Sequence, residues 1–240
     1  MNDLPASQLA FCPVLAEIVR TGEAIGASGK RIPNWSMSTT SNLLTMRNLH
    51  LTLRPERTLE TGLRFGGSAL MFTQTHKDLG AEPARQHIAI DPYQRSPFND
   101  SSGLLAIDRA QLMPFLDFRE DFSSRVLPAL LSAGESFSMI YLDGSHNLED
   151  VFIDLYYSVQ LLGMDGVVLF DDSTHPHLRK ILKFVRRNLR HCLEPMDMCP
   201  FHPDKSLRYR AARALGRIQL TGFKKVGELA RPHGYDLKNF

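Results

Sequence analysis

The segment LETGLRFGGSAL, residues 59–70, decides which fold this sequence predicts. A short apolar run leads into it and a helix-forming run follows it, so we expect a strand that turns into a helix through a glycine-rich loop. The spacing of Gly62, Gly66 and Gly67 differs from G-x-G-x-x-G, and the P-loop pattern is absent from the sequence. Glu60 precedes the first glycine and would repel a pyrophosphate. The loop is therefore predicted to suit a ligand with a cationic group or free hydroxyls.

Strand and helix patterns alternate along the chain on either side of this loop. Strands are predicted at residues 57–62, 86–93, 113–121, 137–144 and 166–172. Helices are predicted at residues 66–80, 101–112, 123–135, 147–163 and 177–190. This alternation predicts a parallel sheet with helices on both faces. Two last strands at 190–198 and 221–230, with a basic helix at 204–217 between them, complete the expected fold.

The section ahead of the first strand has a different pattern. Residues 6–22 and 41–53 have helical apolar spacing, and the stretch from 22 to 40 between them is rich in Gly, Ser, Pro and Thr. We expect residues 1–54 to form an N-terminal helical cap or lid, and residues 55–240 to form the main domain.

The helix predicted at residues 147–163 has the clearest ends. Asn147 is expected to be its N-cap, with Glu149 and Asp150 placed favourably in the first turn. Gly163 is expected in the left-handed conformation that commonly ends a helix.

Composition sets the broad class. The 240-residue chain is 43% hydrophobic and 22% charged, as expected of a globular protein with one full core. An apolar run long enough to span a membrane is lacking, the N-terminus is unlike a secretory signal, and three cysteines are too few for a disulfide framework. A cytoplasmic protein without a membrane partner is therefore expected.

The charge is unevenly distributed. From His175 onward the chain has 15 Lys and Arg against 5 Asp and Glu, whereas the first 174 residues have 13 against 21. Such asymmetry is compatible with an anionic partner. Because aromatic residues are not interleaved with these charges in an RNA-binding pattern, we favour a solvated basic surface and do not expect a nucleic-acid partner.

Acidic residues stand at the ends of four predicted strands. They are Glu60, Asp91, Asp143 and the pair Asp171 and Asp172. In open α/β sheets, ligands bind beyond the carboxyl ends of the strands, and an acid after the second strand can accept the hydroxyl hydrogens of a ribose. Asp91 has that position. With an acid ahead of the glycine loop, the pattern favours a positively charged nucleoside without phosphate, such as S-adenosylmethionine (SAM).

The motifs LETGLRFGGSAL, HIAIDPY, IYLDGSHNLEDVFIDL and LLGMDGVVLFDDS together resemble the class I, Rossmann-like SAM-dependent methyltransferases with an E-x-G-x-x-x-G-x-S first motif. The resemblance covers roughly residues 55–190. It implies a three-layer αβα sandwich around a seven-stranded, mostly parallel sheet with an antiparallel last strand. It places Glu60, Gly62 and Ser68 at the methionine end of SAM, Asp91 at the ribose, and Asp121 or Ser123 near the adenine. The cofactor residues that it implies are Glu60, Gly62, Gly66, Ser68, Asp91, Asp121, Ser123 and Asp143.

Two arrangements are available to activate a hydroxyl acceptor, which is a poor nucleophile at neutral pH. Asp143, Asp171 and Asp172 supply the oxygen ligands that Mg²⁺ prefers, so Mg²⁺ is a candidate second cofactor. Alternatively, His146, three residues after Asp143, acts as a general base. The sequence leaves both open, and Asp143 and His146 are the candidate catalytic residues.

We expect an enzyme that methylates a small-molecule acceptor, with a hydroxyl as the preferred target. The alternatives are N-methylation, methylation of an RNA held by the basic C-terminal region, or a domain that binds SAM or another nucleoside without catalysis. A homodimer is compatible with the sequence, which does not determine the oligomeric state.

Overall fold

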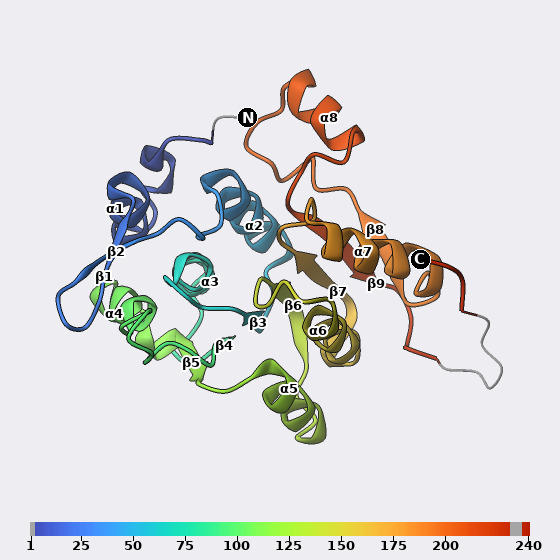
Figure 1. The fold of residues 1–240 in the computed structure, drawn as a ribbon, viewed down its shortest axis with the longest axis horizontal. Coiled ribbons are helices and arrows are strands. Elements are labelled where there is room, and N and C mark those ends of the chain that lie inside the picture. The colour runs from blue at the N-terminus through green and yellow to red at the C-terminus, as the bar shows by residue number, and fades with distance from the viewer. Residues whose placement is uncertain (1–2, 231–236) are drawn as a thin grey trace. The chain divides into compact units, whose positions relative to one another are not determined.

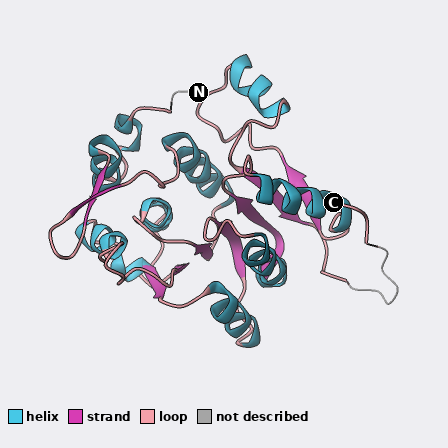
Figure 2. Ribbon diagram, viewed as in Figure 1, coloured by secondary structure: helices cyan, strands magenta, loops and turns pink. Residues whose placement is uncertain are grey.

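The computed structural model describes residues 3–230 and 237–240. In these residues a seven-stranded sheet has the order β5-β4-β3-β6-β7-β9-β8 (Figures 1 and 2). Its strands are β3 (Thr58–Thr61), β4 (His87–Ile90), β5 (Leu116–Arg119), β6 (Phe137–Leu142), β7 (Leu162–Phe170), β8 (Leu193–Met196) and β9 (Thr221–Lys225). Each strand falls within or overlaps a predicted one, so the α/β alternation is confirmed.

The sheet is parallel except at its last strand. β3 pairs with β6, β4 with β5, and β6 with β7 in parallel, whereas β9 is antiparallel to both β7 and β8. The predicted antiparallel last strand is therefore confirmed. All four residues of β3 and of β4 are buried, as expected of parallel strands that are covered on both faces.

The helices between the strands also agree with the sequence pattern. They are α3 (Gly67–Asp78), α4 (Ser102–Arg109), α5 (Ser123–Ser132), α6 (Leu148–Leu161), α7 (Pro176–Asn188) and α8 (Leu207–Ala214), with a 3₁₀ turn at Met113–Phe115. Figure 2 shows helices alternating with the strands. In the described part of the chain, none of the helices is long and apolar enough to cross a membrane.

The N-terminal section differs from the expectation in two places. The predicted helix at 6–22 is divided into a 3₁₀ turn at Ala6–Leu9 and α1 (Pro13–Thr21), because a proline is well suited to the first turn of a new helix. The predicted loop contains a hairpin of β1 (Glu23–Ile25) and β2 (Arg31–Pro33). Strands of three residues are too short to show a periodic pattern. The second predicted helix is confirmed as α2 (Thr40–Leu53).

The ends of α6 confirm one expectation and correct another. Asn147 occupies the N-cap position, but its amide donates a hydrogen bond to Asp150 at 3.2 Å and does not cap the helix backbone. The helix runs directly into β7 at Leu162, so the prediction of a left-handed Gly163 was wrong. The left-handed residue is Asp165, with φ 63°. It lies in an irregularity of the β6–β7 pairing, a tertiary feature with no local sequence pattern.

Contacts divide the chain into two compact units. The first unit consists of Met1–Arg54, Gly62–Phe122 and Phe201–Asp204, and the second of Pro55–Thr61, Ser123–Pro200 and Lys205–Phe240. In the first unit, α1 contacts α3 and α4, and α2 contacts α3. The N-terminal section thus packs on the helix that follows the glycine-rich loop. The division into a lid of residues 1–54 and a domain of residues 55–240 stays a prediction.

Three buried histidines lie together in the core of the first unit. The rings of His50 in α2 and His76 in α3 are 4.5 Å apart, and His87 in β4 stacks on Phe72. Burial, followed by the nearby histidines, lowers the pKa of His50 from 6.5 to about 2 and the pKa of His76 to about 3. Both rings are therefore neutral in the folded protein at neutral pH.

The two lowered pKa values predict acid-sensitive stability. In the unfolded chain both histidines bind protons below about pH 6.5, whereas the folded chain leaves them neutral, so stability falls as the pH drops through this range. Each histidine contributes a slope of about 1.4 kcal/mol per pH unit. We expect His50→Leu to reduce the slope of the unfolding free energy against pH by one such contribution, measured by urea unfolding between about pH 6 and pH 4. The matched control is His191→Leu at an exposed position, and equal slopes in both variants would contradict the prediction.

Candidate functional site

The glycine-rich loop between β3 and α3 has an uncommon backbone. Gly62, Arg64 and Gly66 have positive φ values of 92°, 38° and 76°. The amide of Gly62 donates to the carbonyl of Ile90 at the end of β4, at 2.8 Å. A Cβ at Gly66 would lie 3.0 Å from the carbonyl oxygen of Gly103. The loop therefore requires glycine at position 66 for both its conformation and its close packing.

Asp91, directly after β4, holds this loop in place. Its Oδ2 accepts hydrogen bonds from the amides of Leu63 at 3.2 Å and Arg64 at 2.8 Å, and its Oδ1 accepts from the amide of Tyr93 at 2.7 Å. Gln94 donates both to Asp91 Oδ2 and to the carbonyl of Arg64. Asp91 is only 6% exposed. Since a carboxylate oxygen can accept two hydrogen bonds, Oδ1 keeps capacity for one more donor.

The first unit contains two more predicted cofactor residues, Ser68 and Asp121. Ser68 lies in the first turn of α3 and is buried. Asp121 follows β5, and its Oδ1 accepts a hydrogen bond from the amide of Phe122 at 2.8 Å. The structure thus gathers Gly62, Gly66, Ser68, Asp91 and Asp121 in one unit.

In the second unit, two of the predicted acids share one phenol. The hydroxyl of Tyr141 lies 2.5 Å from Asp171 Oδ2 and 3.2 Å from Asp143 Oδ2. Residues two apart in a strand point to the same face, which brings Asp143 beside Tyr141. Leu142 pairs with Phe170 across β6 and β7, so the next residue of each strand, Asp143 and Asp171, lies at the same level of the sheet.

This arrangement favours protonation of Asp143. A phenol has one hydrogen, so it cannot donate fully to both carboxylates. Burial raises the pKa of Asp143 well above its ordinary range, and the negative charges of Asp171 and Asp172 raise it further. A protonated Asp143 can donate to the oxygen of Tyr141 while Tyr141 donates to Asp171.

Asp172 belongs to a different set of contacts. His146 Nε2 lies 3.5 Å from Asp172 Oδ2, and the side chain of Gln219 donates to Asp172 Oδ1 at 3.3 Å. The rings of His146 and His175 are 5.2 Å apart. A histidine that directs its Nε2–H at a carboxylate leaves Nδ1 as the basic nitrogen. His146 is about half exposed, so that nitrogen can reach a ligand.

Asp154 in α6 is a buried acid that the sequence analysis missed. It lines a small cavity of about 10 Å³ together with Asp143, Ser145, His146 and Asp171. Burial raises its pKa to about 6, although the nearby hydroxyls of Ser123 and Thr61 oppose the shift. The apolar stripe of the predicted helix, Leu148, Phe152, Leu155, Val159 and Leu162, does not include Asp154, so local periodicity did not indicate that this acid is buried.

Two predicted cofactor residues of the second unit, Ser123 and Glu60, also interact with its buried acids. Ser123 begins α5, and its hydroxyl hydrogen-bonds to Asp154. Glu60 in β3 is fully buried, and its charge contributes to the raised pKa of Asp143. The second unit therefore places Glu60, Asp143 and Asp171 in one electrostatically coupled set.

The predicted metal ligands do not converge in this arrangement. In the described part of the chain, three or more His, Cys, Asp or Glu side chains are nowhere grouped so that they could hold a metal ion. Asp143 and Asp171 share Tyr141, while Asp172 contacts His146 and Gln219. The Mg²⁺ site of Asp143, Asp171 and Asp172 stays a prediction, and we derive no chemical step through a metal.

Comparison with known proteins agrees with this fold. Residues 59–173 match a family model described as a methyltransferase domain. Comparison with curated protein sequences gives no significant match. Among solved structures, the O-methyltransferase TomG from Streptomyces achromogenes, involved in tomaymycin synthesis and bound to SAM, is 15% identical, with a TM-score of 0.60 over 95% of this chain and 92% of that chain.

Two further structures are similar to a comparable degree. An O-methyltransferase from Bacillus cereus in complex with SAH, S-adenosylhomocysteine, is 12% identical, with a TM-score of 0.62 over 89% of this chain and 90% of that chain. An SAH-bound methyltransferase from Podospora anserina is 16% identical, with a TM-score of 0.61 over 93% and 89%.

The strand order, the glycine loop and these likenesses define the fold of class I, Rossmann-like SAM-dependent methyltransferases. Residues 59–173 match a methyltransferase domain, and this segment lies inside the range of 55–190 over which the sequence resembles the class I methyltransferases. The domain match and the fold agree with the family predicted from the sequence.

The raised pKa of Asp154 predicts a second pH effect, opposite in sign to that of the histidines. The folded protein keeps the Asp154 proton up to about pH 6, whereas the unfolded chain releases it near 3.8, so stability falls as the pH rises between these values. The free energy of unfolding of the wild type should therefore fall by up to about 3 kcal/mol between pH 4 and neutral pH. Because asparagine cannot ionise, we expect Asp154→Asn to lack this fall, measured by urea unfolding at both pH values. Asp165→Asn, at an exposed position, is the control. A pH dependence of Asp154→Asn that parallels the wild type would refute the assignment.

Proposed function

We propose that this methyltransferase uses SAM and transfers the methyl group to a hydroxyl of a small-molecule acceptor. The observation that carries the proposal is the glycine loop held by Asp91. This carboxylate fixes the loop after β3, and its Oδ1 keeps one acceptor position for a ligand. The solved structures bound to SAM or SAH, and the two described as O-methyltransferases, support the same cofactor and the same acceptor atom.

The residues present suit the chemistry of SAM, a sulfonium cation that carries a nucleoside. We assign the ribose hydroxyls to Asp91 Oδ1, since a carboxylate at this position of the fold accepts them. The buried charge of Glu60 favours a cation over a phosphate. Gly62 and Gly66 allow close approach of the loop backbone, and Ser68 adds a hydroxyl at the methionine end. Asp121 and Ser123 are proposed to lie toward the adenine.

In the reaction, SAM supplies a methyl group on a positively charged sulfur. The acceptor oxygen forms a bond to the methyl carbon as the carbon–sulfur bond breaks, and the hydroxyl proton must leave. We propose that Nδ1 of His146 accepts this proton, with Asp172 holding the ring and its tautomer. The hydrogen-bonded Tyr141, Asp143 and Asp171 hold the adjacent strand ends in position.

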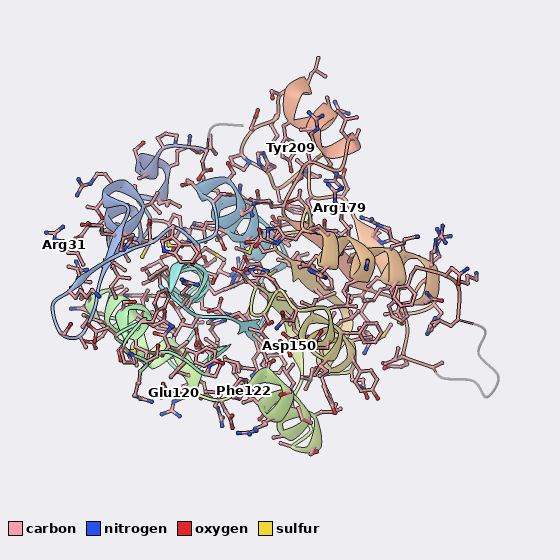
Figure 3. All side chains as sticks on the ribbon, in the orientation of Figure 1. Arg31, Glu120, Phe122, Asp150, Arg179 and Tyr209 are labelled. Atoms are coloured by element: carbon pink, nitrogen blue, oxygen red, sulfur yellow. The ribbon has the colours of Figure 1, made fainter. Side chains whose placement is uncertain are left out.

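A second candidate substrate is RNA, because α7 presents a basic surface. Five of its side chains are exposed cations: Arg179, Lys180, Lys183, Arg186 and Arg187. Arg179 is labelled in Figure 3. RNA binding through these residues would weaken steeply with salt, so filter binding at two salt concentrations distinguishes it from small-molecule methylation. N-methylation, a non-catalytic SAM-binding role, a cytoplasmic location and a homodimer stay predictions from the sequence.

Calorimetry with SAM tests the cofactor assignment. We expect saturable binding by the wild-type protein, and an affinity at least about tenfold weaker in Asp91→Asn. The amide has one acceptor oxygen, so it cannot both hold the loop, as Oδ2 does, and accept the ribose hydroxyls, as Oδ1 is proposed to do. Asp108→Asn, at an exposed position on α4, should bind SAM as the wild type does. Absence of SAM binding by the wild type would remove the proposal.

The same titration with Mg²⁺ added tests the predicted metal set. Tighter SAM binding with Mg²⁺ that Asp172→Asn abolishes would establish a metal role for these acids, and full activity in chelator would refute it.

Substitution of His146 tests the proposed base. With an acceptor chosen from a panel of hydroxylated small molecules, we expect His146→Ala to reduce kcat by about a hundredfold or more while SAM affinity is retained. His177→Ala, an exposed neighbour on α7, is the matched control. Unchanged turnover in His146→Ala would exclude it as the base, and unchanged turnover in Asp143→Ala would exclude a direct role for that acid.

A further inference from the structure

The second unit contains a cavity that is lined, in the described part of the chain, by none of the residues assigned to SAM, the acceptor or a metal. Its volume is about 320 Å³, and its lining comes from α6, α7 and the residues that follow β9. Protein interiors are closely packed, with few voids larger than a water molecule. Small-molecule sites in proteins begin at about 300 Å³. This space, which we call the α6–α7 cavity, therefore has the size of a ligand site and not of a packing defect.

The two helices contribute apolar side chains to the cavity. Those from α6 are three or four residues apart and share one face of the helix: Phe152, Leu155, Tyr156 and Val159. Leu155 and Val159 are buried, whereas Phe152 and Tyr156 are only partly buried. The ring of Phe152 lies 4.8 Å from the ring of Phe184 in α7. The lining therefore extends from the hydrophobic core toward the surface.

A third wall of the cavity is formed by residues 237–240, which specific contacts hold against α7. The side-chain amide of Asn188 donates to the carbonyl of Lys238 at 3.0 Å and accepts from the backbone N–H of Lys238 at 2.8 Å. The ring of Phe240 lies 4.9 Å from the ring of Phe184. Figure 1 shows this end of the ribbon beside α7. Leu237 and Phe240, on either side of the hydrogen-bonded residue, line the cavity.

The chemistry of the lining suits an uncharged ligand. Among the described residues around the cavity, none is Lys, Arg, Asp or Glu, and the polar side chains are those of Tyr156, Asn188 and His191. The amide of Asn188 is used by the backbone of Lys238, and His191 is exposed. An ion in this cavity would lose its hydration without gaining a charged partner, which is unfavourable.

We propose that the α6–α7 cavity binds an uncharged aromatic molecule of two fused rings. The size follows from the volume, because an apolar cavity of about 150 Å³ binds benzene and this one is about twice as large. The aromatic class follows from Phe152, Phe184 and Phe240, whose rings can contact a planar ligand by edge or by face. The inference is independent of the proposed function, since this ligand needs neither a hydroxyl nor the cofactor.

Equilibrium dialysis of naphthalene against the wild-type protein tests this inference. Naphthalene has two fused rings, no charge and no hydroxyl that could be methylated. We expect saturable binding of one molecule per chain, with naphthalene-2-sulfonate and decan-1-ol each at least about tenfold weaker. The sulfonate brings a charge that the lining does not pair, and the flexible chain of decanol loses more conformational freedom when it is bound.

Two variants locate the binding. Ala230 lines the cavity at an exposed position, so Ala230→Trp should place an indole ring in the space and weaken naphthalene binding by about tenfold or more. Phe240→Ala should also weaken it, because the variant lacks one ring of the lining. Ala133→Trp, at an exposed position directly after α5, is the matched control and should bind naphthalene as the wild type does. Urea unfolding verifies that each variant is folded.

Each contrary outcome removes a stated part of the inference. Absence of saturable naphthalene binding by the folded wild type, or undiminished binding by Ala230→Trp and Phe240→Ala, would overturn the site. Equal affinity for decan-1-ol would refute the aromatic class, and equal affinity for the sulfonate would refute the uncharged one. Sedimentation tests a different occupant, because a dimer that Ala230→Trp dissociates would assign the cavity to a second copy of this chain.

Discussion

The hydrogen bonds from the loop backbone to the Asp91 carboxylate are the constraint on which the candidate cofactor site depends. Without a fixed acceptor, a loop with positive φ at Arg64 would be unfavourable, since a non-glycine residue in that region costs about 1–3 kcal/mol. Asp91 satisfies two amides of the loop and one of its own turn. One side chain after β4 thereby determines the shape of the segment after β3. The close glycine contacts and the start of α3 follow from that shape.

Burial acts on the ionisable groups of both units in opposite directions. It lowers the pKa of His50 and His76, because it disfavours their protonated, charged form. It raises the pKa of Asp143 and Asp154, because here the charged form is the deprotonated one. The protein therefore keeps the two histidines neutral near neutral pH and raises the pH at which the two acids ionise. The core of the first unit avoids buried positive charge, and the acid cluster of the second unit reduces its mutual repulsion.

The sequence by itself determined the order of strands and helices, the glycine loop and the acids at the strand ends, because these depend on local periodicity and on spacing along the chain. Glu60, Asp91 and Asp143 could be predicted in this way. Only the tertiary structure decided which acids hydrogen-bond to Tyr141 and that Asp172 pairs with His146. It also brought Trp35 onto Arg64. These partners are mostly far apart in the chain, so their contacts depend on strand register and packing, which leave no periodic pattern in the sequence.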